Sequence, residues 1–284
     1  MSRKLLEVKN LTKTYCEGAI ENRAVDHVSL EVDLGEFVVL MGASGSGKTS
    51  LLHLLAGIDD FNEGTVEYTQ RAGGLRPSRY TQGHTDMANP FMTGVVDFGR
   101  MKEKEKSLFR RENLGIVFQQ QCLIPDLTVC ENIMLPLMLA QPRGGNESRT
   151  SRKDRVLGLC TRFGLEEHAD KVPSRLSGGQ QQRAAILRAI VNKPPLLLCD
   201  EPTGSLNLAQ TQLVMELLSE LNQDGQTILL VTHDIRVAAR GSRVIYIEDG
   251  RVAGELMFAR PDALDVEASD KEHRLMDFLK ERGW

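Results

Sequence analysis

The stretch Gly42-Ala-Ser-Gly-Ser-Gly-Lys-Thr49 fits the pattern G-x-x-x-x-G-K-[ST] at every fixed position. The segment 36–41, just before it, runs apolar without alternation after its first residue, which is typical of a strand covered on both faces. The segment 49–56, just after it, has the composition of a helix. A buried strand, a glycine-rich turn and a helix in this order are the context of a P-loop, so the sequence predicts a phosphate site here.

The physical basis of this site is a cluster of backbone N–H groups. Glycines let the backbone turn inward without clashes from a Cβ atom, and the start of the helix adds partial positive charge. Lys48 would reach the β- and γ-phosphates of a nucleotide, and the Thr49 hydroxyl would hold Mg²⁺. The spacing excludes a dinucleotide-binding turn, because Gly47 is followed three residues later by Ser50. The expected binding residues are Gly42, Ser44, Gly45, Ser46, Gly47, Lys48, Thr49 and Ser50.

The composition indicates a globular chain with a sizeable core. Its 284 residues are 41% hydrophobic and 26% charged, which excludes a disordered or low-complexity protein. The net charge of −4 excludes a global basic field, so no nucleic-acid partner is expected. No run of eighteen apolar residues occurs, and the five cysteines form no CxxC pair. We therefore expect no membrane span, free thiols in a reducing cytoplasm and no thiolate metal site.

Predicted strands and helices alternate along the chain. The strand-like segments are 114–119, 196–199 and 227–232, and the clearest helix-like segments are 181–192 and 208–222. This alternation favours a parallel α/β sheet. Near the end, an Asp-Gly pair between apolar runs predicts a β-hairpin over 244–252.

A pair of acidic residues follows one of the buried strands. The apolar run 196–199 delivers Asp200 to the edge of the sheet, where its carboxylate can join the Mg²⁺ shell. Glu201, one residue on, can polarise a water against the γ-phosphate as a general base. A strand that merely ends in an acidic turn is the alternative, and it accounts less well for an Asp-Glu pair followed by Pro-Thr-Gly.

The stretch Leu176-Ser-Gly-Gly-Gln-Gln-Gln-Arg183 predicts a second helix start that can bind an anion, through an N-cap serine and two glycines. It resembles the signature of ABC ATPases. Further matches follow the order of that family: Tyr15 at the A-loop, Gln119 at the Q-loop, residues 204–207 at the D-loop and His233 at the H-loop. The whole set in this order is far more specific than any single motif.

The resemblance implies the fold class and the domain organisation. It implies an α/β fold, with a P-loop NTPase (RecA-like) core, an antiparallel β subdomain and an inserted α-helical signature subdomain at about 120–190. The cassette is expected over 5–255, and an acidic, helical tail over 256–284. ATP and Mg²⁺ are the implied cofactors. The implied catalytic residues are Glu201, His233, Lys48 and Gln119; the base and signature contacts are Tyr15, Ser177, Gly178, Gly179 and Gln180; and the metal ligands are Thr49, Gln119 and Asp200.

The resemblance also implies partners. In this family the signature of one chain faces the P-loop of another, so a working site is expected to need two copies, head to tail. The segments 111–119 and 127–136 resemble the LolD/MacB/FtsE group of ABC transporter ATP-binding subunits. The chain is therefore expected to be an ATPase that drives an integral membrane permease of the FtsX/MacB type, in lipoprotein, peptide or antibiotic export. Its expected place is the cytoplasm, peripheral on the inner face of the cell membrane.

Three alternatives stay open beside this function. An FtsE-like mechanotransmission ATPase would regulate the cell envelope through its permease without a transported substrate. A soluble ABC protein of DNA repair or translation would usually show tandem cassettes, coiled-coil insertions or zinc cysteines, which the sequence lacks. A simple P-loop kinase would lack the second phosphate-binding helix start.

Two features depart from the family pattern. Asn207 stands where the family usually has an aspartate, and the segment 70–100 is longer than the family needs between the P-loop and the Q-loop. Residues 70–111 carry nine Lys/Arg and four Asp/Glu, a local charge of +5. A surface insertion is favoured, and contact with a partner or with anionic lipid is the alternative. The end of this segment, 102–106, predicts a solvated helix.

Two further segments lie outside the motifs. The polar, glycine-containing segment 141–153 predicts a solvated loop. In the tail, Leu275, Phe278 and Leu279 fall on one face of a predicted helix. That face would pack on the core or on a partner, and the sequence does not distinguish the two.

Overall fold

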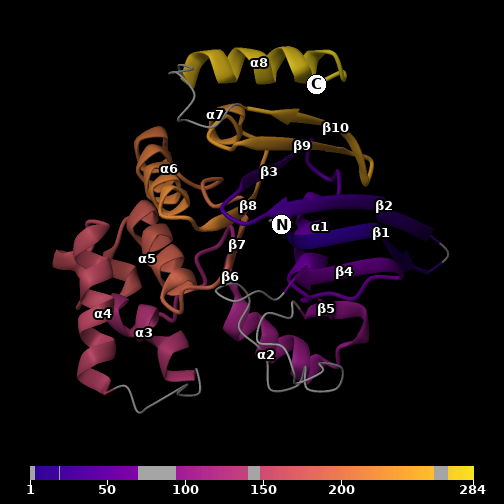
Figure 1. The fold of residues 1–284 in the computed structure, drawn as a ribbon. Helices are drawn as coiled ribbons and strands as arrows, with labels where there is room; N and C mark the ends of the chain where they lie inside the picture. Colours follow the sequence, from indigo (N-terminus) through magenta and orange to yellow (C-terminus); the bar gives the residue numbers. More distant parts are fainter. Residues whose placement is uncertain (1–3, 19, 70–93, 140–147, 259–267) are drawn as a thin grey trace.

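The structure is a computed structural model that describes residues 4–18, 20–69, 94–139, 148–258 and 268–284 (Figure 1). The described residues form two sheets with helices packed around them. Most of the predicted insertion at 70–100 lies outside the described residues. No helix in the described part of the chain is both long and apolar enough to cross a membrane.

The larger sheet has the strand order β10-β9-β3-β8-β7-β6. Its strands are β3 (Phe37–Met41), β6 (Leu114–Val117), β7 (Leu196–Asp200), β8 (Thr227–Thr232), β9 (Arg243–Glu248) and β10 (Arg251–Met257). Neighbours from β9 to β6 are parallel, and β10 forms the predicted antiparallel hairpin with β9. β3, β7 and β8 are buried along their whole length, which confirms the predicted parallel sheet with two covered faces.

The smaller sheet is antiparallel and has the order β2-β1-β4-β5. Its strands are β1 (Lys4–Glu17), β2 (Ile20–Asp33), β4 (Glu63–Thr69) and β5 (Val95–Asp97). Helix α1 (Lys48–Leu55) packs against both sheets. Its four leucines share one core cluster with Val66 of the smaller sheet and Leu229 of the larger one. The helix that follows the P-loop is therefore held from both sides.

A second core cluster fills the opposite face of the larger sheet. Successive residues of β3 alternate between the two clusters, since Val38 belongs to the first and Val39 to the second. Helices α3 (Val129–Leu139), α4 (Arg149–Arg162), α5 (Gly178–Ile190) and α6 (Leu208–Gln223) contribute to the second cluster. In Figure 1, α3, α4 and α5 form a group to the left of the sheets, with α6 above it. Short 3₁₀ turns at Glu166–His168 and Pro173–Arg175 connect α4 to α5.

The prediction of a solvated loop over 141–153 is wrong for its last five residues. Helix α4 begins at Arg149, where the Ser148 side chain accepts a hydrogen bond from the Ser151 N–H at 3.1 Å. Val156 and Cys160, one turn apart, are fully buried and fix this helix to its neighbours. The first turns look like a loop in the sequence because polar and charged residues dominate them. Residues 141–147 lie outside the described part of the chain.

The prediction of a solvated helix at 102–106 is also wrong in part. The segment does enter a helix, α2 (Glu103–Asn113), after a 3₁₀ turn at Phe98–Arg100. Lys106, however, is buried, and its ammonium forms an ion pair with Asp60. The buried Phe109 on the same helix forms an aromatic cluster with Tyr68 and Phe98, with ring centroids 4.9–5.0 Å apart. Packing against the smaller sheet therefore draws one face of α2 away from solvent.

The tail helix packs on the core. Helix α8 (Ala268–Lys280) lies over the β9–β10 hairpin and beside the short helix α7 (Ile235–Ala238) (Figure 1). The predicted apolar face is real, because Leu275, Phe278 and Leu279 are buried in the second core cluster. Trp284 adds an edge-to-face contact with Tyr246 of β9, with centroids 6.0 Å apart.

The packing of α8 predicts different effects for neighbouring apolar residues. The Leu279→Ala substitution should lower the free energy of unfolding by about 2–5 kcal/mol, because it removes a fully buried side chain and leaves a cavity. The Met276→Ala substitution is the matched control, because Met276 is 40% exposed on the same helix, and it should change stability by about 0.5 kcal/mol or less. Denaturant unfolding measures both. Equal effects of the two substitutions would contradict the docking of α8 on the core.

Candidate functional site

The P-loop connects β3 to α1 at the carboxyl end of β3. Gly45 and Gly47 have φ angles of 83° and 95°, which a residue with a side chain rarely adopts. A Cβ atom at Gly47 would lie 1.9 Å from the carbonyl oxygen of Ala24, and one at Gly42 would lie 2.1 Å from that of Ile247. Glycine is therefore required at positions 42 and 47, because backbone from other strands fills the space.

The side chain of Lys48 folds back into the loop. Its Nζ donates hydrogen bonds to the carbonyl oxygen of Ala43 at 2.6 Å and to Oγ of Ser46 at 3.2 Å. Burial lowers the pKa of Lys48, although the carboxylates of Glu201 and Asp200 oppose this shift. A buried ammonium at the start of a helix, inside a glycine loop, is a favourable environment for a phosphate group.

Thr49 and Asp200 meet beside the loop. The Thr49 hydroxyl donates to Oδ1 of Asp200 at 2.9 Å, which joins the first turn of α1 to the end of β7. Burial raises the pKa of Asp200, while the Thr49 hydrogen bond and the nearby His53 oppose the rise. Among the described residues, no group of three or more His, Cys, Asp or Glu side chains could hold a metal by itself. A metal at this point would depend on ligands such as this hydroxyl and carboxylate together with oxygens from outside the protein.

Glu201 is held in an unusual backbone conformation. Its φ angle is 42°, in the left-handed region that costs a residue with a side chain about 1–3 kcal/mol. Its N–H donates a hydrogen bond to the carbonyl oxygen of Val231 at 3.0 Å, so the carboxyl end of β8 holds this turn. Its Oε1 lies 3.0 Å from Nδ1 of His233, which follows β8. Glu201 and His233, both named above as implied catalytic residues, are thus in hydrogen-bond contact.

A pocket of about 670 Å³ opens above the P-loop and brings most predicted site residues together. The predicted residues that line it are Tyr15, Ser44, Gly45, Gly47, Lys48, Thr49, Ser50, Gln119 and Glu201. Gln119 lies two residues beyond the end of β6, since the predicted strand 114–119 stops at Val117. Gly42, Ser46 and Asp200 do not line the pocket but contact residues near it. Gly42 lies against the carbonyl oxygen of Ile247, Ser46 accepts a hydrogen bond from Lys48, and Asp200 accepts one from Thr49. His233 lines a smaller neighbouring pocket of about 160 Å³, which shares Glu201 with the larger one.

The signature residues lie elsewhere in the fold. Ser177 is the N-cap of α5: its Oγ accepts from the Gln180 N–H at 3.3 Å, and Oε1 of Gln180 accepts from the Ser177 N–H at 2.8 Å. A Cβ atom at Gly179 would lie 2.9 Å from Cγ of Gln210 on α6, and one at Gly178 would lie 3.4 Å from Leu206. None of residues 177–180, all of them within the described chain, lines the P-loop pocket. Within one chain, the signature therefore does not form part of the P-loop pocket.

The D-loop segment 204–207 connects Glu201 to α6. A Cβ atom at Gly204 would lie 3.1 Å from Oε2 of Glu201 and 3.2 Å from Nε2 of Gln119, so a side chain here would require these two side chains to shift. Asn207, the departure from the family pattern, is the N-cap of α6, and its Oδ1 accepts from the Gln210 N–H at 2.9 Å. An amide oxygen serves this local role as well as a carboxylate oxygen does.

Within the described ranges, the P-loop pocket is also lined by five residues that the motifs did not indicate: Asn22, Arg23, Ala24, Asp249 and Gly250. They come from β2 and from the turn of the β9–β10 hairpin. The Asp-Gly pair in the sequence predicts that turn, but nothing in it indicates that the turn reaches the P-loop. The Gly250 N–H donates to the carbonyl oxygen of Ser46 at 3.1 Å, which explains its place at the site.

Asp26 joins this turn to β2. Its N–H donates to the carbonyl oxygen of Gly250 at 2.8 Å, and its Oδ2 accepts from Nε of Arg251 at 2.6 Å. Hydrogen bonds from His27, Arg251 and Arg23 lower the pKa of Asp26 to about 2, against the opposing effect of burial. A charged Asp26 therefore supports the wall of the pocket.

Comparisons with known proteins agree with one another. The profile of the family described as ABC transporter matches residues 25–204. The macrolide export ATP-binding/permease protein MacB of Syntrophobacter fumaroxidans is 40% identical over 252 residues, which cover 88% of this chain and 31% of that protein. The lipoprotein-releasing system ATP-binding protein LolD of Syntrophotalea carbinolica is 38% identical over 251 residues, which cover 88% of this chain and 97% of that protein. The chain thus spans about a third of the length of the MacB relatives that it matches.

A solved structure supports the same relationship. The ATP-binding cassette MJ0796 of Methanocaldococcus jannaschii, in a dimeric post-hydrolysis state bound to ADP and Pi, superposes with a TM-score of 0.74 at 38% identity. The match covers 90% of this chain and 99% of that chain. The α/β fold predicted from the sequence is therefore confirmed, both by the sheets described above and by this likeness.

The low pKa of Asp26 predicts a pH dependence of stability. Because the pKa of Asp26 falls from 3.8 to about 2 on folding, its stabilisation is present above about pH 4 and is lost as the pH falls toward 2. Between about pH 5 and pH 2 the wild type should lose more stability than the Asp26→Asn variant, as measured by urea unfolding at each pH. Asp126→Asn, in an exposed position, is the control and should follow the wild type. An unchanged pH slope in Asp26→Asn would contradict the ion-pair assignment.

Proposed function

Because the chain belongs to the ABC transporter family, we propose that it binds ATP and Mg²⁺ in the P-loop pocket and hydrolyses the ATP. One observation carries this proposal: Lys48, Thr49 and Glu201 line one pocket, and the Thr49 hydroxyl donates a hydrogen bond to Asp200 beside it. These groups supply a phosphate contact, a metal contact and a base within one site.

The pocket fits a nucleoside triphosphate in shape and charge. The P-loop presents backbone N–H groups and the Lys48 ammonium, which would bind the β- and γ-phosphates. Asp200 and Thr49, which share a hydrogen bond, would hold Mg²⁺ together with Gln119 from the pocket lining. Mg²⁺ is commonly bound by one or two carboxylates and the phosphates of its substrate. Mg²⁺ neutralises the negative charge that develops on the phosphates during transfer. Tyr15, at the wall of the pocket, offers its ring to the base.

Glu201 is the proposed general base, and His233 its partner. A base must lie within reach of the water that it activates, and Glu201 extends from the end of β7 into the pocket beside the phosphate loop. The 3.0 Å contact with Nδ1 of His233 limits the positions that the carboxylate can take. The turn with positive φ, tied to Val231, fixes the main chain beneath it.

A complete site is proposed to need two copies of the chain. Ser177, Gly178, Gly179 and Gln180 open a helix whose N–H groups suit an anion, yet none of them lines the pocket of their own chain. The cassette MJ0796 has been solved as a dimer bound to ADP and Pi. In the proposed head-to-tail homodimer, the signature of each copy completes the P-loop pocket of the other.

The second proposed partner is an integral membrane permease of the FtsX/MacB type. The MacB relative combines an ATP-binding part with a permease part in one protein, and this chain matches only about a third of its length. The LolD relative is an ATP-binding protein of a lipoprotein-releasing system. We place this chain at the inner face of the cell membrane through such a permease, which ATP-driven opening and closing of the dimer would move.

The Glu201→Gln variant should bind ATP but fail to turn it over. Removal of a general base should lower the ATPase rate by about 10²- to 10⁴-fold. Because ATP then remains between the two copies, gel filtration in the presence of ATP should show a dimer. The Glu281→Gln variant, an exposed carboxylate in the tail, is the matched control and should behave as wild type. Full ATPase activity of Glu201→Gln would remove Glu201 from this role.

Lys48 tests the binding step separately. Lys48→Ala should weaken ATP affinity itself, whereas Lys104→Ala, which removes an exposed lysine on α2, should not. Isothermal titration with MgATP measures both affinities. Unchanged ATP affinity of Lys48→Ala would count against the assignment of the P-loop.

The permease proposal predicts a stable membrane complex. The tagged chain, purified from detergent-solubilised native membranes, should carry one integral membrane protein in stoichiometric amount, identified by mass spectrometry. A chain that is purified from the same membranes without such a partner would favour a soluble ABC protein instead.

A further inference from the structure

The Tyr15 side chain is held by an acidic residue that no motif contains. Its hydroxyl donates to Oδ2 of Asp59 at 2.7 Å, while the ring itself lines the P-loop pocket. Asp59 comes from the loop 57–60 that follows α1, forty-four residues away in the sequence. The contact therefore joins β1, which carries Tyr15, to the loop that follows α1.

Lys13 fixes both partners of this contact. Its Nζ donates to Oδ1 of Asp59 at 2.9 Å and to the carbonyl oxygen of Asp60 at 2.6 Å. The same ammonium lies 4.8 Å from the centroid of the Tyr15 ring. The Lys13 ammonium thus lies over the Tyr15 ring, and the Asp59 carboxylate restrains the Tyr15 hydroxyl. The ring therefore has a defined orientation at the pocket.

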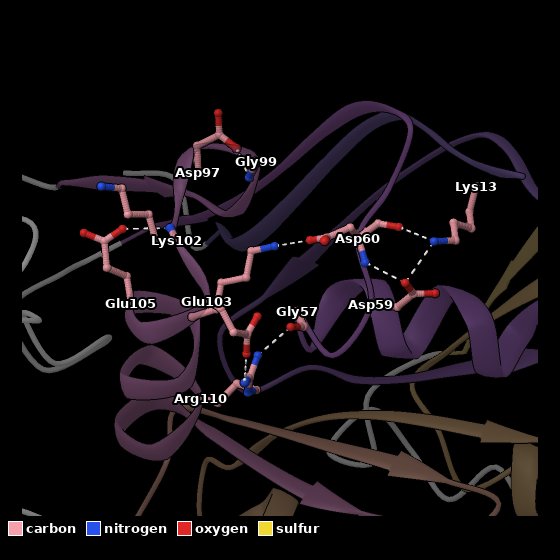
Figure 2. A network of polar contacts seen from close by, with 11 residues as sticks. Lys13, Gly57, Asp59, Asp60, Asp97, Gly99, Lys102, Glu103, Glu105 and Arg110 are labelled. Atoms are coloured by element: carbon pink, nitrogen blue, oxygen red, sulfur yellow. Dashed lines mark hydrogen bonds and ion pairs between the residues drawn. The ribbon is translucent and has the colours of Figure 1, made fainter.

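The loop 57–60 is itself held from the other side by α2. Figure 2 shows Lys13 and Arg110 reaching this loop from opposite directions. Arg110 donates to the carbonyl oxygen of Gly57, and Lys106 forms an ion pair with Asp60. The Asp60 N–H closes the turn onto Oδ1 of Asp59 at 2.7 Å. The Asp59 carboxylate is therefore restrained by its hydrogen bonds to Lys13, Tyr15 and the Asp60 N–H.

We propose that Asp59 is a positioning residue for the nucleotide base: it orients the Tyr15 ring, and the oriented ring contributes binding energy to the base and not to the phosphates. This inference rests on the proposed function, because it concerns the same pocket. A hydrogen bond to the ring hydroxyl lowers the conformational entropy that the ring would lose on stacking. The effect is expected for a ligand with a base and is absent for a ligand made of phosphates alone.

The charges of the pair support this role. Burial and the Asp59 contact raise the pKa of Tyr15, with opposition from Ser50, so the phenol stays protonated and remains a donor at neutral pH. Burial would raise the pKa of Asp59, but hydrogen bonds from Lys13, Tyr15 and the Asp60 N–H lower it overall. The carboxylate therefore stays charged and remains an acceptor.

The test compares a ligand with a base and a ligand without one on the full chain. Isothermal titration would give the Kd of MgATP and of magnesium tripolyphosphate for wild type, Asp59→Ala, Tyr15→Phe and the double variant. Asp59→Ala should weaken MgATP by about three- to tenfold and leave tripolyphosphate within about twofold. Tyr15→Phe keeps the ring but loses the donor, so it should match Asp59→Ala. The double variant should be no weaker than either single one, because both remove the same bond.

Each other outcome has a defined meaning. An equal loss for both ligands would assign Asp59 a structural role only, and unchanged MgATP affinity or additive losses in the double variant would also overturn the inference. Asp126→Ala, an exposed carboxylate outside the network, is the control for loss of charge. Unchanged MgATP affinity in Lys48→Ala would overturn the proposed function itself. Weakened binding in Lys48→Ala with unchanged binding in Asp59→Ala would overturn only the role of Asp59.

Discussion

The carbonyl oxygen of Ala24 lies so close to Gly47 that no side chain fits between them. Through this contact the smaller sheet touches the P-loop directly, since Ala24 belongs to β2. The turn of the β9–β10 hairpin also approaches the Ala24 carbonyl oxygen, because a Cβ atom at Gly250 would lie 3.0 Å from it. The pocket walls come from both sheets, so the pocket exists only when this backbone junction is formed. The glycines of the P-loop thus serve the assembly of the fold as well as the binding of phosphate.

Much of the fold could be predicted from the sequence because its central strands are buried on both faces. The run of β8 is apolar from Ile228 to Val231 and buried throughout, and a helix precedes it in the sequence, so the pattern predicts a strand covered on both faces. The secondary-structure and exposure predictions were wrong for segments of polar or charged composition that contain buried residues. The charged first turns of α4 form a helix because Ser148 caps it and Val156 and Cys160 anchor it. Lys106 is buried because Asp60, far away in the sequence, supplies the opposite charge.

The candidate site also contains some residues that could be predicted from the sequence and others that could not. Lys48 and Glu201 belong to short motifs whose spacing is set by a single turn, so their positions could be predicted from the sequence. The other wall of the pocket, with Arg23 and Asp249, is formed by β2 and the turn of the β9–β10 hairpin, which meet only in the folded chain. No local pattern distinguishes such residues from ordinary turn residues, because their role follows from long-range backbone contacts. Asp59 belongs to the same class, since nothing in its own segment indicates the Tyr15 hydroxyl.

Within the chain, the start of the signature helix α5 contacts α6, and the segment before α6 contacts the Glu201 side chain. Gly179 lies against Gln210, and the same Gln210 provides the N–H that Asn207 caps at the start of α6. Gly204, at the other end of this short segment, lies close to the side chains of Glu201 and Gln119. A short series of contacts, at Gln210 and Gly204, thus links the signature to the Glu201 side chain. In a head-to-tail dimer these contacts would connect the phosphate held by the signature in one pocket to the Glu201 carboxylate in the other, so the two pockets would not respond independently.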